Sequence, residues 1–352
     1  MTLIPPATDL ACLDLPRPYL LFLGDVTEAG YAKTAFGLRD WAREHCVGEL
    51  ALGNAISVGL PRLTPAEARA CGARSMVIGV ANVGGRILES WLPSLLEALA
   101  AGLDIVSGMH VRLGATPALA AAAERHQRRL IDVRTPPRDI PIASGRKRSG
   151  KRLLAVGTDC ALGKKYTALV LAREFRRRGL DADFRASGQT GILIAGGGMP
   201  IDAVVSDFVA GAAELLSPDA DAGHWDVIEG QGSLFHPSYS GVSLGLLHGS
   251  QPDVVVLCHE EGRDAILGLE DFPLPSLDEA IYLHLELARR TNPRVRCAGV
   301  SLNTAKLSAA HARAVLAERR AQLGMPVADP MRGGPELEEL VASCLSPSRS
   351  QA

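Results

Sequence analysis

The sequence lacks several patterns that would place it in a specialised class of protein. Its seven cysteines are scattered over 352 residues and include no Cys-x-x-Cys pair, so neither a zinc ribbon nor a disulfide framework is expected. No stretch approaches the about 20 apolar residues of a membrane helix. Residues 1–15 have neither the basic start nor the apolar core of a signal peptide. These absences predict a reduced, soluble, cytoplasmic protein with no membrane partner.

An excess of charge of either sign is also lacking. The chain has 37 Lys and Arg against 39 Asp and Glu, a formal net charge of −2. Nucleic-acid binding generally requires a basic surface, so no nucleic-acid partner is expected. Charged residues make up 22% and hydrophobic residues 47%, which is typical of a folded globular protein. At about 100–200 residues per domain, the length indicates two domains.

Strands and helices are predicted to alternate, which favours an α/β fold with mainly parallel sheets covered by helices. Between them, residues 135–151 are rich in Pro, Gly, Ser and basic residues, so two domains are predicted at 1–138 and 152–345, joined by a linker at 139–151. The predicted strands are 19–24, 75–82, 104–108, 130–133, 152–157, 181–187, 224–230, 252–260, 294–303 and 325–330. The predicted helices are 35–45, 63–72, 89–102, 116–130, 164–179, 200–216, 276–290 and 308–324.

The strongest chemical signal is the segment GTDCALGKKYT at 157–167, which follows an apolar strand and opens a helix. In a phosphate-binding loop, glycines let backbone N–H groups point inward, while the helix N-terminus and a lysine attract the anion. A glycine-rich turn with an incidental lysine is the simpler interpretation, but the full combination favours diphosphate binding. The predicted cofactor-binding residues of this loop are Gly157, Thr158, Asp159, Cys160, Gly163, Lys164 and Lys165.

This loop departs from the usual Walker pattern in two ways. Five residues separate its glycines instead of four, and Lys165 stands where Ser or Thr normally ligates Mg²⁺. An ammonium group cannot ligate a metal, and Thr167 lies two residues further along. We therefore expect a diphosphate bound without a metal, which favours a ligand with an ADP-like part such as coenzyme A.

Three acid–base candidates follow predicted strands, where open α/β sheets place their ligands: Glu229, His236 and His259. Each also has a structural interpretation, as a cap or a buried side chain, and the sequence does not select among them. Asn303 and Asp329 end the last two predicted strands and are expected near the base of the nucleotide.

The substrate-binding candidates are less specific. Gln189 and Thr190 lie in a glycine-rich segment, 187–198, that is predicted to be a loop against a ligand or a simple connector. Arginines after strands can bind a carboxylate through two hydrogen bonds, which makes Arg263, Arg112 and Arg86 candidates, although such residues are often ordinary surface groups. No Gly-x-Gly-x-x-Gly follows the first strand, so a dinucleotide site there is not favoured.

Two motifs, GTDCALGKK and DVIEGQG, resemble dethiobiotin synthetase and its phosphate-loop relatives. A resemblance over nearly the whole chain is to the DgcN family, through GTDCALGKKYTAL, SGQTGILIAGGGMPIDAVVSDFVAGAAE, EGQGSLFHPSYSGVSLGLLHGSQPD, VSLNT and DPMRGG. It implies a Rossmann-like N-terminal domain, a P-loop NTPase-like C-terminal domain, and an enzyme that transfers acetyl from acetyl-CoA to D-glutamate.

The alternatives are a Mg-ATP-dependent ligase or small-molecule kinase of the dethiobiotin-synthetase type, or a non-catalytic nucleotide-binding protein. Lys165 speaks against the first of these. A small-molecule substrate is the predicted partner, and the sequence leaves a homo-oligomer open.

Overall fold

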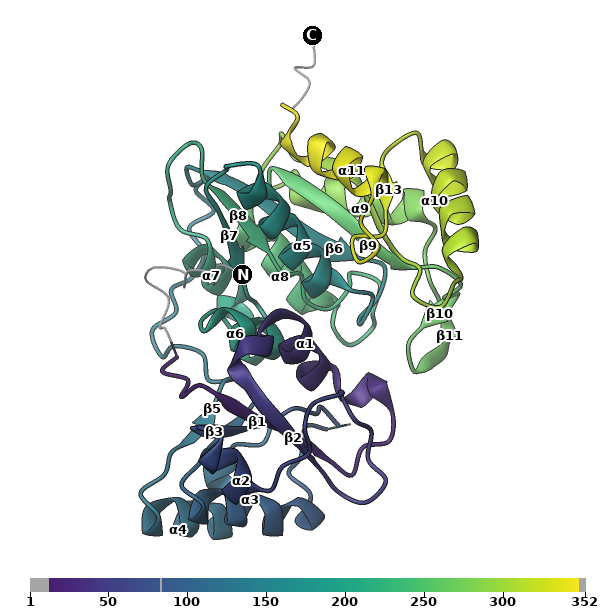
Figure 1. Ribbon diagram of the computed structural model, residues 1–352. Coiled ribbons are helices and arrows are strands. Elements are labelled where there is room, and N and C mark those ends of the chain that lie inside the picture. Colours follow the sequence, from purple (N-terminus) through teal and green to yellow (C-terminus); the bar gives the residue numbers. More distant parts are fainter. Residues whose placement is uncertain (1–12, 83, 348–352) are drawn as a thin grey trace. The chain divides into compact units, whose positions relative to one another are not determined.

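The computed structural model describes residues 13–82 and 84–347, and the chain divides into two compact units (Figure 1). The N-terminal unit runs up to Thr135 and also includes Gln189–Pro200. The C-terminal unit consists of Pro136–Gly188 and the chain from Ile201 onward. No pattern in the sequence indicates that a segment of its second half is built into the N-terminal unit. The domain limits taken from composition stay a prediction.

The N-terminal unit is built on a parallel five-stranded sheet in the order β2-β1-β3-β4-β5. Figure 1 shows α1 and α6 on one face of this sheet and α2, α3 and α4 on the other. The strands are β1 (Tyr19–Gly24), β2 (Cys46–Ala51), β3 (Ser75–Ile78), β4 (Asp104–Ser107) and β5 (Leu130–Asp132). The helices are α1 (Lys33–Trp41), α2 (Pro65–Ala70), α3 (Leu92–Ala100), α4 (Pro117–Arg125) and α6 (Gln189–Ala195).

Local sequence explains how this unit begins its helices and ends its first strand. Thr64 caps α2 through a capping box with Glu67, whereas Thr116 stands at the N-cap of α4 without a side-chain capping bond. Gly24 ends β1 with φ of +54°, and a Cβ there would lie 2.7 Å from the Trp91 ring. Trp91 also donates to Asp25, so this strand end is used in packing.

The C-terminal unit is built on a parallel six-stranded sheet in the order β13-β12-β9-β6-β8-β7. A separate antiparallel hairpin of β10 and β11 follows β9. The sheet strands are β6 (Lys151–Gly157), β7 (Ala182–Arg185), β8 (Trp225–Ile228), β9 (Val254–Glu260), β12 (Arg296–Asn303) and β13 (Val327–Ala328). The hairpin strands are β10 (Ala265–Ile266) and β11 (Leu269–Pro273).

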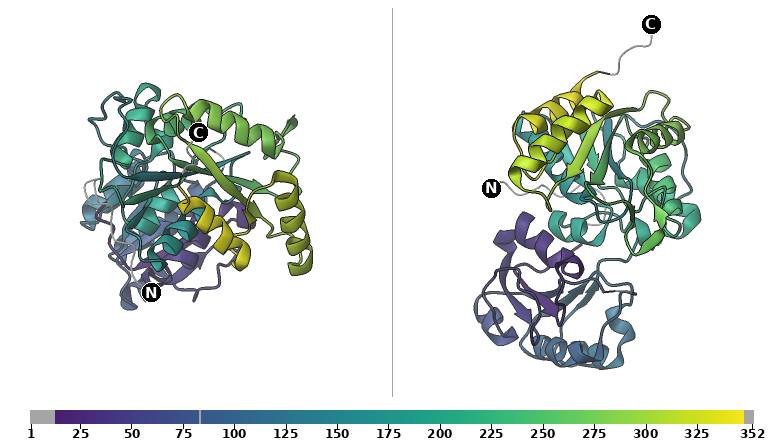
Figure 2. Two further views of the ribbon diagram at one scale, coloured as in Figure 1. Left: turned by 90° about the horizontal axis from the view of Figure 1, so that it is seen from above. Right: turned by 90° about the vertical axis from the view of Figure 1, so that its right-hand side faces the viewer.

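Helices cover both faces of this second sheet (Figure 2), as expected for buried parallel strands. α5 and α11 pack on one face, and α8 and α9 pack on the other, with α7 against α8. α10 lies beside the edge strand β13. The helices are α5 (Lys164–Arg177), α7 (Val209–Leu216), α8 (Ser240–Ser250), α9 (Leu277–Ala288), α10 (Ala309–Leu323) and α11 (Pro335–Leu345).

The predicted alternation of strands and helices is confirmed, but some predicted elements were wrong or missing. The expected helix at 200–216 is formed only by α7, after two short 3-10 turns. The segment 187–198, expected to be a loop, contains the helix α6, because its apolar side chains are buried. The strand β2 and the helices α8 and α11 were not predicted.

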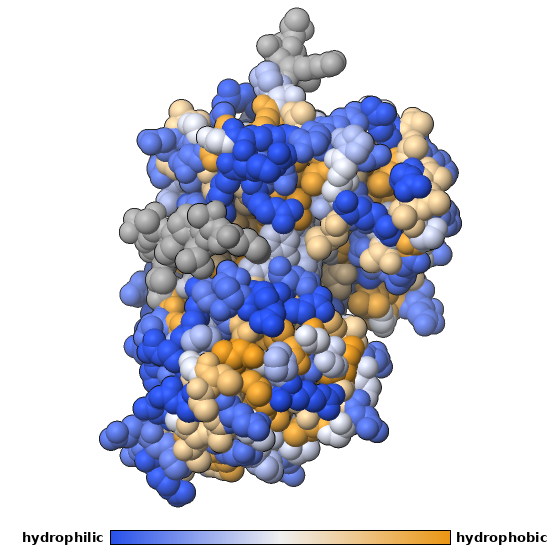
Figure 3. All heavy atoms as spheres, viewed as in Figure 1, coloured by the Kyte–Doolittle hydropathy of each residue, from blue (hydrophilic) through white to orange (hydrophobic). Residues whose placement is uncertain are grey.

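Three further observations concern the described cysteines, the described helices and one face of the surface. The six cysteines in residues 13–347 are all outside disulfides, which agrees with their scattered spacing. Across those same residues, every helix is too short or too polar to cross a membrane. The face drawn in Figure 3 mixes hydrophilic and hydrophobic side chains in both units.

A buried histidine at the start of β8 gives the C-terminal unit a pH-dependent contribution to stability. His224 lies 2.8 Å from Asp181 and 3.2 Å from Asp226, and hydrogen bonds to Asp226 and Asp181 raise its pKa to about 9. A raised folded-state pKa stabilises the fold fully below the usual value of 6.5, and this contribution is lost as pH rises through about 9.

We therefore expect His224→Gln to lower the thermal midpoint most at about pH 6, with the difference from the wild type nearly gone at about pH 10. Thermal unfolding across that range measures it. His311→Gln, on the exposed side of α10, is the control and should change little at any pH. A difference that grows with pH would contradict the assignment of the charge to His224.

Candidate functional site

The candidate site residues of the C-terminal unit gather at the carboxyl ends of β6, β8 and β9. β6 lies between β8 and β9, and successive strands are added first on one side of it and then on the other. Such a reversal opens a crevice at the strand ends, where α/β proteins bind their ligands. The segment 157–165 begins at the last residue of β6, Glu229 follows β8, and His259 is near the end of β9.

The loop from Gly157 to Lys164 has the backbone of an anion-binding turn. Ala161 and Gly163 both have positive φ, +57° and +113°, and Gly163 is the N-cap of the 14-residue helix α5. A left-handed turn directly before a long helix leaves the first N–H groups of that helix unpaired and pointing outward. Glycine suits the close approach at position 157, because a Cβ there would lie only 3.2 Å from the carbonyl oxygen of Cys258.

Asp159 fixes this loop to the neighbouring strand and hairpin. Its carboxylate is completely buried and accepts hydrogen bonds from Arg263 (3.0 Å) and from the backbone N–H of Leu267 (2.8 Å). Its other oxygen accepts from the N–H of Cys160. Arg263 also donates to the carbonyl of Cys160 and pairs with Glu260. Arg263, predicted to hold a substrate carboxylate, therefore has protein carboxylates as partners in this structure.

Lys164 is a buried lysine that forms no ion pair in the described part of the chain. Its side chain is 7% exposed, and its ammonium donates one hydrogen bond, 2.7 Å long, to the carbonyl of Asp159. Burial lowers its pKa, and the more distant carboxylates of Asp159 and Glu229 oppose this shift only in part. Removing a charge from water is costly unless a partner replaces the water. The position therefore favours an anionic ligand at the loop.

The residues that follow Lys164 do not supply a hydroxyl to the loop. Thr167 is turned into the unit, where its hydroxyl lies 2.7 Å from the Ser301 hydroxyl and 3.5 Å from the Cys258 sulfur. Lys165, which replaces the usual Ser or Thr, lies over the ring of Tyr166 and near Glu229. The hydroxyl that ligates Mg²⁺ in a Walker loop has no equivalent at position 165.

Glu229 has the properties of a general base. It is 5% exposed, and its Oε2 accepts hydrogen bonds from the backbone N–H groups of Ser187 (3.1 Å) and Gly188 (3.2 Å). Oε1 accepts no hydrogen bond from the described residues. Burial raises the pKa of Glu229 to about 7, although the nearby charge of Lys165 opposes the shift. A carboxylate with a pKa near neutral pH and an open oxygen is suited to accept a proton.

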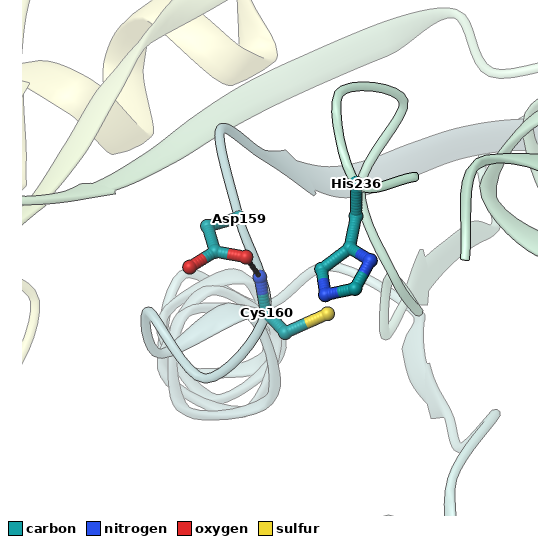
Figure 4. Close-up of side chains that lie close together, drawn as sticks. All are labelled: Asp159, Cys160 and His236. Carbon is teal, nitrogen blue, oxygen red and sulfur yellow. Dashed lines mark hydrogen bonds between the residues drawn. The ribbon is translucent and has the colours of Figure 1, made fainter. Parts of the chain in front are cut away.

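His236 is oriented as a hydrogen-bond donor toward the loop. Its Nδ1 accepts from the backbone N–H of Ser238 (3.1 Å), so the neutral ring carries its proton on Nε2. Figure 4 shows the Nε2 edge turned toward Cys160. A hydrogen-bond donor at this place is better suited to bind an anionic ligand than to act as a general base.

Asp159, Cys160 and His236 each offer one atom within 4.8 Å of the others, the spacing of a metal site (Figure 4). In this structure these groups are engaged by donors of the protein itself. Both oxygens of Asp159 already accept hydrogen bonds, and Nε2 of a neutral His236 is protonated, whereas a ligating nitrogen must offer a lone pair. That the protein needs no metal stays a prediction.

The other predicted residues of this unit hold loops at the strand ends. His259 Nδ1 lies 2.9 Å from the Thr158 hydroxyl, and burial lowers its pKa. Asp329 accepts from the N–H and hydroxyl of Thr304 and so joins the ends of β12 and β13. Asn303 accepts from the N–H of Ala305. A place for the adenine near Asn303 and Asp329 stays a prediction.

Four predicted substrate residues lie in the N-terminal unit. Gln189 donates to the carbonyl of Gly108 (2.7 Å) and accepts from Arg134 (3.2 Å), with its amide oriented to satisfy both. The Thr190 hydroxyl lies 2.9 Å from that of Thr34 and is buried. Arg86 and Arg112 are exposed, and each lies on a loop. The two loops are joined by a hydrogen bond from the N–H of Val111 to the carbonyl of Gly85.

Sequence reasoning missed the groups that hold Glu229 and those behind the loop. The N–H groups of Ser187 and Gly188 are 42 and 41 residues from Glu229 in the chain. His284 lies on α9 and lines a cavity with Lys164. The sequence carries no signal for His284, because a single histidine in an amphipathic helix is usually an ordinary core residue.

Two family models match the chain. Residues 44–136 match a domain described as Rossmann-like, and residues 141–341 match a domain described as a P-loop domain; both are domains of unknown function. This chain belongs to the DUF1611 family. The match confirms the predicted fold class, with a Rossmann-like N-terminal domain and a P-loop C-terminal domain.

The chain is similar to two named proteins and to a solved structure. A protein from Tritonibacter scottomollicae, named D-glutamate N-acetyltransferase, is 52% identical over 91% of this chain and 96% of its own length. A protein of the same name from a Pseudoalteromonas species is 45% identical over 94% and 99%. The crystal structure of a DUF1611 family protein from Anabaena variabilis is 32% identical over 94% and 98%, with a TM-score of 0.83.

Proposed function

We propose that this protein is a D-glutamate N-acetyltransferase that uses acetyl-CoA as the acetyl donor. Two relatives with that name are 52% and 45% identical to it over more than nine tenths of the chain. The named reaction needs a site for the anionic diphosphate of coenzyme A and a base for the amino group. The C-terminal unit has a candidate for each.

The observation that carries the proposal is the buried ammonium of Lys164. It has one hydrogen bond, to the carbonyl of Asp159, and no carboxylate partner among the residues described. It lies at the N-terminus of α5, whose dipole adds positive potential at the same place. Lys165 adds a second positive charge where a Walker loop would recruit Mg²⁺. The loop thus supports a diphosphate neutralised by lysines.

Glu229 is the proposed general base. The amino group of D-glutamate is protonated at neutral pH and must lose a proton before it can attack the thioester. The open Oε1 of Glu229 accepts that proton, and the N–H groups of Ser187 and Gly188 hold the other oxygen. That first proton passes to solvent, the neutral amine forms the C–N bond and gives its next proton to Glu229, the C–S bond breaks, and Glu229 protonates the departing thiolate. The acetyl group ends as the amide of N-acetyl-D-glutamate, and free CoA is released.

The experiment that tests this function is a thiol-release assay with acetyl-CoA and matched D- and L-amino acids, with and without Mg²⁺ and ATP. We expect free CoA with D-glutamate, in amounts that do not depend on Mg²⁺. N-acetyl-D-glutamate, identified by mass spectrometry, should form in equal amount. ADP formation that requires Mg²⁺, without release of CoA, would replace the proposal with a ligase or kinase. Binding of CoA without turnover would indicate a non-catalytic binding protein.

A further inference from the structure

A small cavity lies behind the phosphate loop, on the face of the sheet that α8 and α9 cover; its lining is mostly apolar but includes a few polar side chains. It is lined by the end of β6, by Lys164, by the turn 230–233, by Ser243 and Leu246 of α8, and by His284 of α9. About 10 Å³ of it is open to the centre of a water molecule, which is the space that a single buried water needs.

His284 lines this cavity and carries one unprotonated ring nitrogen. The residue is 2% exposed, and its Nδ1 donates to the carbonyl of Ala280 over 2.7 Å. The neutral ring therefore carries a lone pair on Nε2, which has no hydrogen-bond partner among the described residues. Burial lowers the pKa of His284 to about 4, and the positive charge of Lys164 acts in the same direction, so the ring is neutral at physiological pH.

The other walls offer both donors and acceptors. The Ser243 hydroxyl donates to the carbonyl of Gln231 (2.6 Å), which leaves its oxygen lone pairs open. Lys164 uses one of its three N–H donors on the carbonyl of Asp159. A buried polar atom without a partner is costly, and ordered water is the usual remedy where protein groups do not meet.

We propose that this cavity holds a water molecule that accepts a hydrogen bond from Lys164 and donates one to Nε2 of His284. The second proton of the water points to the oxygen of Ser243. Because Nδ1 of His284 is held by Ala280, its lone pair has a fixed direction and orients the water. Lys164 is then held from behind by a water and from the loop by the Asp159 carbonyl. His284 is a positioning residue for the anion-binding lysine, a role that rests on the proposed function.

The test compares two substitutions at His284 with a matched control on α8. His284→Phe keeps a ring and removes the lone pair, whereas His284→Gln keeps an acceptor. We expect His284→Phe to raise the KM for acetyl-CoA about three- to tenfold with kcat changed less than about twofold. His284→Gln should stay within about twofold of the wild-type KM. His248→Phe removes a histidine that bonds to the carbonyl of Leu287 and does not line the cavity, so it should leave the KM unchanged.

A crystal structure of the wild-type protein that shows ordered waters gives a readout independent of activity. Density for a water within hydrogen-bond distance of Nε2 of His284 and of the Lys164 ammonium is the expected result. A dry cavity, or equal KM values for wild type and His284→Phe, would overturn the proposal even if one variant folds poorly. If the enzyme does not use acetyl-CoA, the proposed function fails. The presence or absence of the water in the crystal structure then still decides the inference about the cavity.

Discussion

Lys164→Met should raise the KM for acetyl-CoA by about ten- to a hundredfold, the usual size of a lost charge-assisted hydrogen bond. Lys164 has one protein acceptor and no carboxylate partner in the described chain, so its charge is available to the diphosphate. Methionine keeps most of the side-chain volume, which limits the effect to the ammonium. Steady-state kinetics with acetyl-CoA as the varied substrate, at saturating D-glutamate, measures it.

Two controls separate anion binding from damage to the fold. Lys151→Met removes an exposed lysine at the other end of β6, where it lies over the ring of Trp225, and should leave both KM values unchanged. The thermal midpoint of Lys164→Met should not fall, because burial already disfavours the charged form of this lysine. A rise in the KM for D-glutamate alone would mean that the loop binds the carboxylates of the acceptor. Unchanged values for both substrates would remove the loop from the site.

The loop could be predicted because its signal is local. An apolar strand, two glycines, a lysine and a helix follow one another within residues 151–177, and the chain folds them as β6, the turn and α5. The departure at Lys165 was equally readable, since it depends on one position. The structure adds that Thr167 is turned toward Ser301, which fits a site without a Walker hydroxyl.

The elements α8 and β2 were not predicted because they depend on contacts with distant parts of the chain. α8 contains Gly245 and Gly249, which lower helix propensity and hid the helix. A Cβ at these positions would lie 2.5 Å from Val209 and 2.1 Å from the carbonyl of Ala210, so the glycines are needed for α7 to pack on α8. β2 was not predicted because it contains a charged residue, Glu49, which is uncommon in a buried strand. Glu49 is buried here because its carboxylate accepts hydrogen bonds from the N–H groups of Val58 and Leu60.

The site could be predicted only in part, because its hydrogen bonds also join residues that are distant in the sequence. Glu229 was selected because it ends a strand, but the N–H groups of Ser187 and Gly188 reach it only once β7 and β8 pair. The orientation of His236 depends on one hydrogen bond from Ser238, which no spacing in the sequence reveals. Strand ends can be found from pattern, whereas protonation states require the folded neighbours.

Glu229→Gln should lower kcat by about two to four orders of magnitude, the usual contribution of a general base. Glutamine keeps the shape of the side chain and can still accept from Ser187 and Gly188, but it cannot take a proton from the substrate amine. Glu229→Asp keeps the carboxylate with a shorter reach and should recover part of the activity. Single-turnover measurements at saturating acetyl-CoA and D-glutamate isolate the chemical step.

The pH dependence identifies the base more sharply than the size of the loss. Glu229 acts as a base only when ionised, and its pKa is raised to about 7, so wild-type kcat should rise with pH through about 7 and then level off. This acid limb should disappear in Glu229→Gln. If the limb and most of the activity remain, the base is another group, and His259, which lies beside Thr158, is the next candidate.

The same raised pKa predicts the stability of the variant. A carboxyl group whose pKa rises from 4.5 to about 7 on folding makes the folded state lose stability as pH increases through that interval. Glutamine does not ionise, so Glu229→Gln should have a higher thermal midpoint than the wild type above about pH 7, with a smaller difference near about pH 5. A variant that is more stable yet inactive places the loss in the chemistry. A variant that is less stable at every pH would mean that the Glu229 carboxylate serves the fold through Ser187 and Gly188.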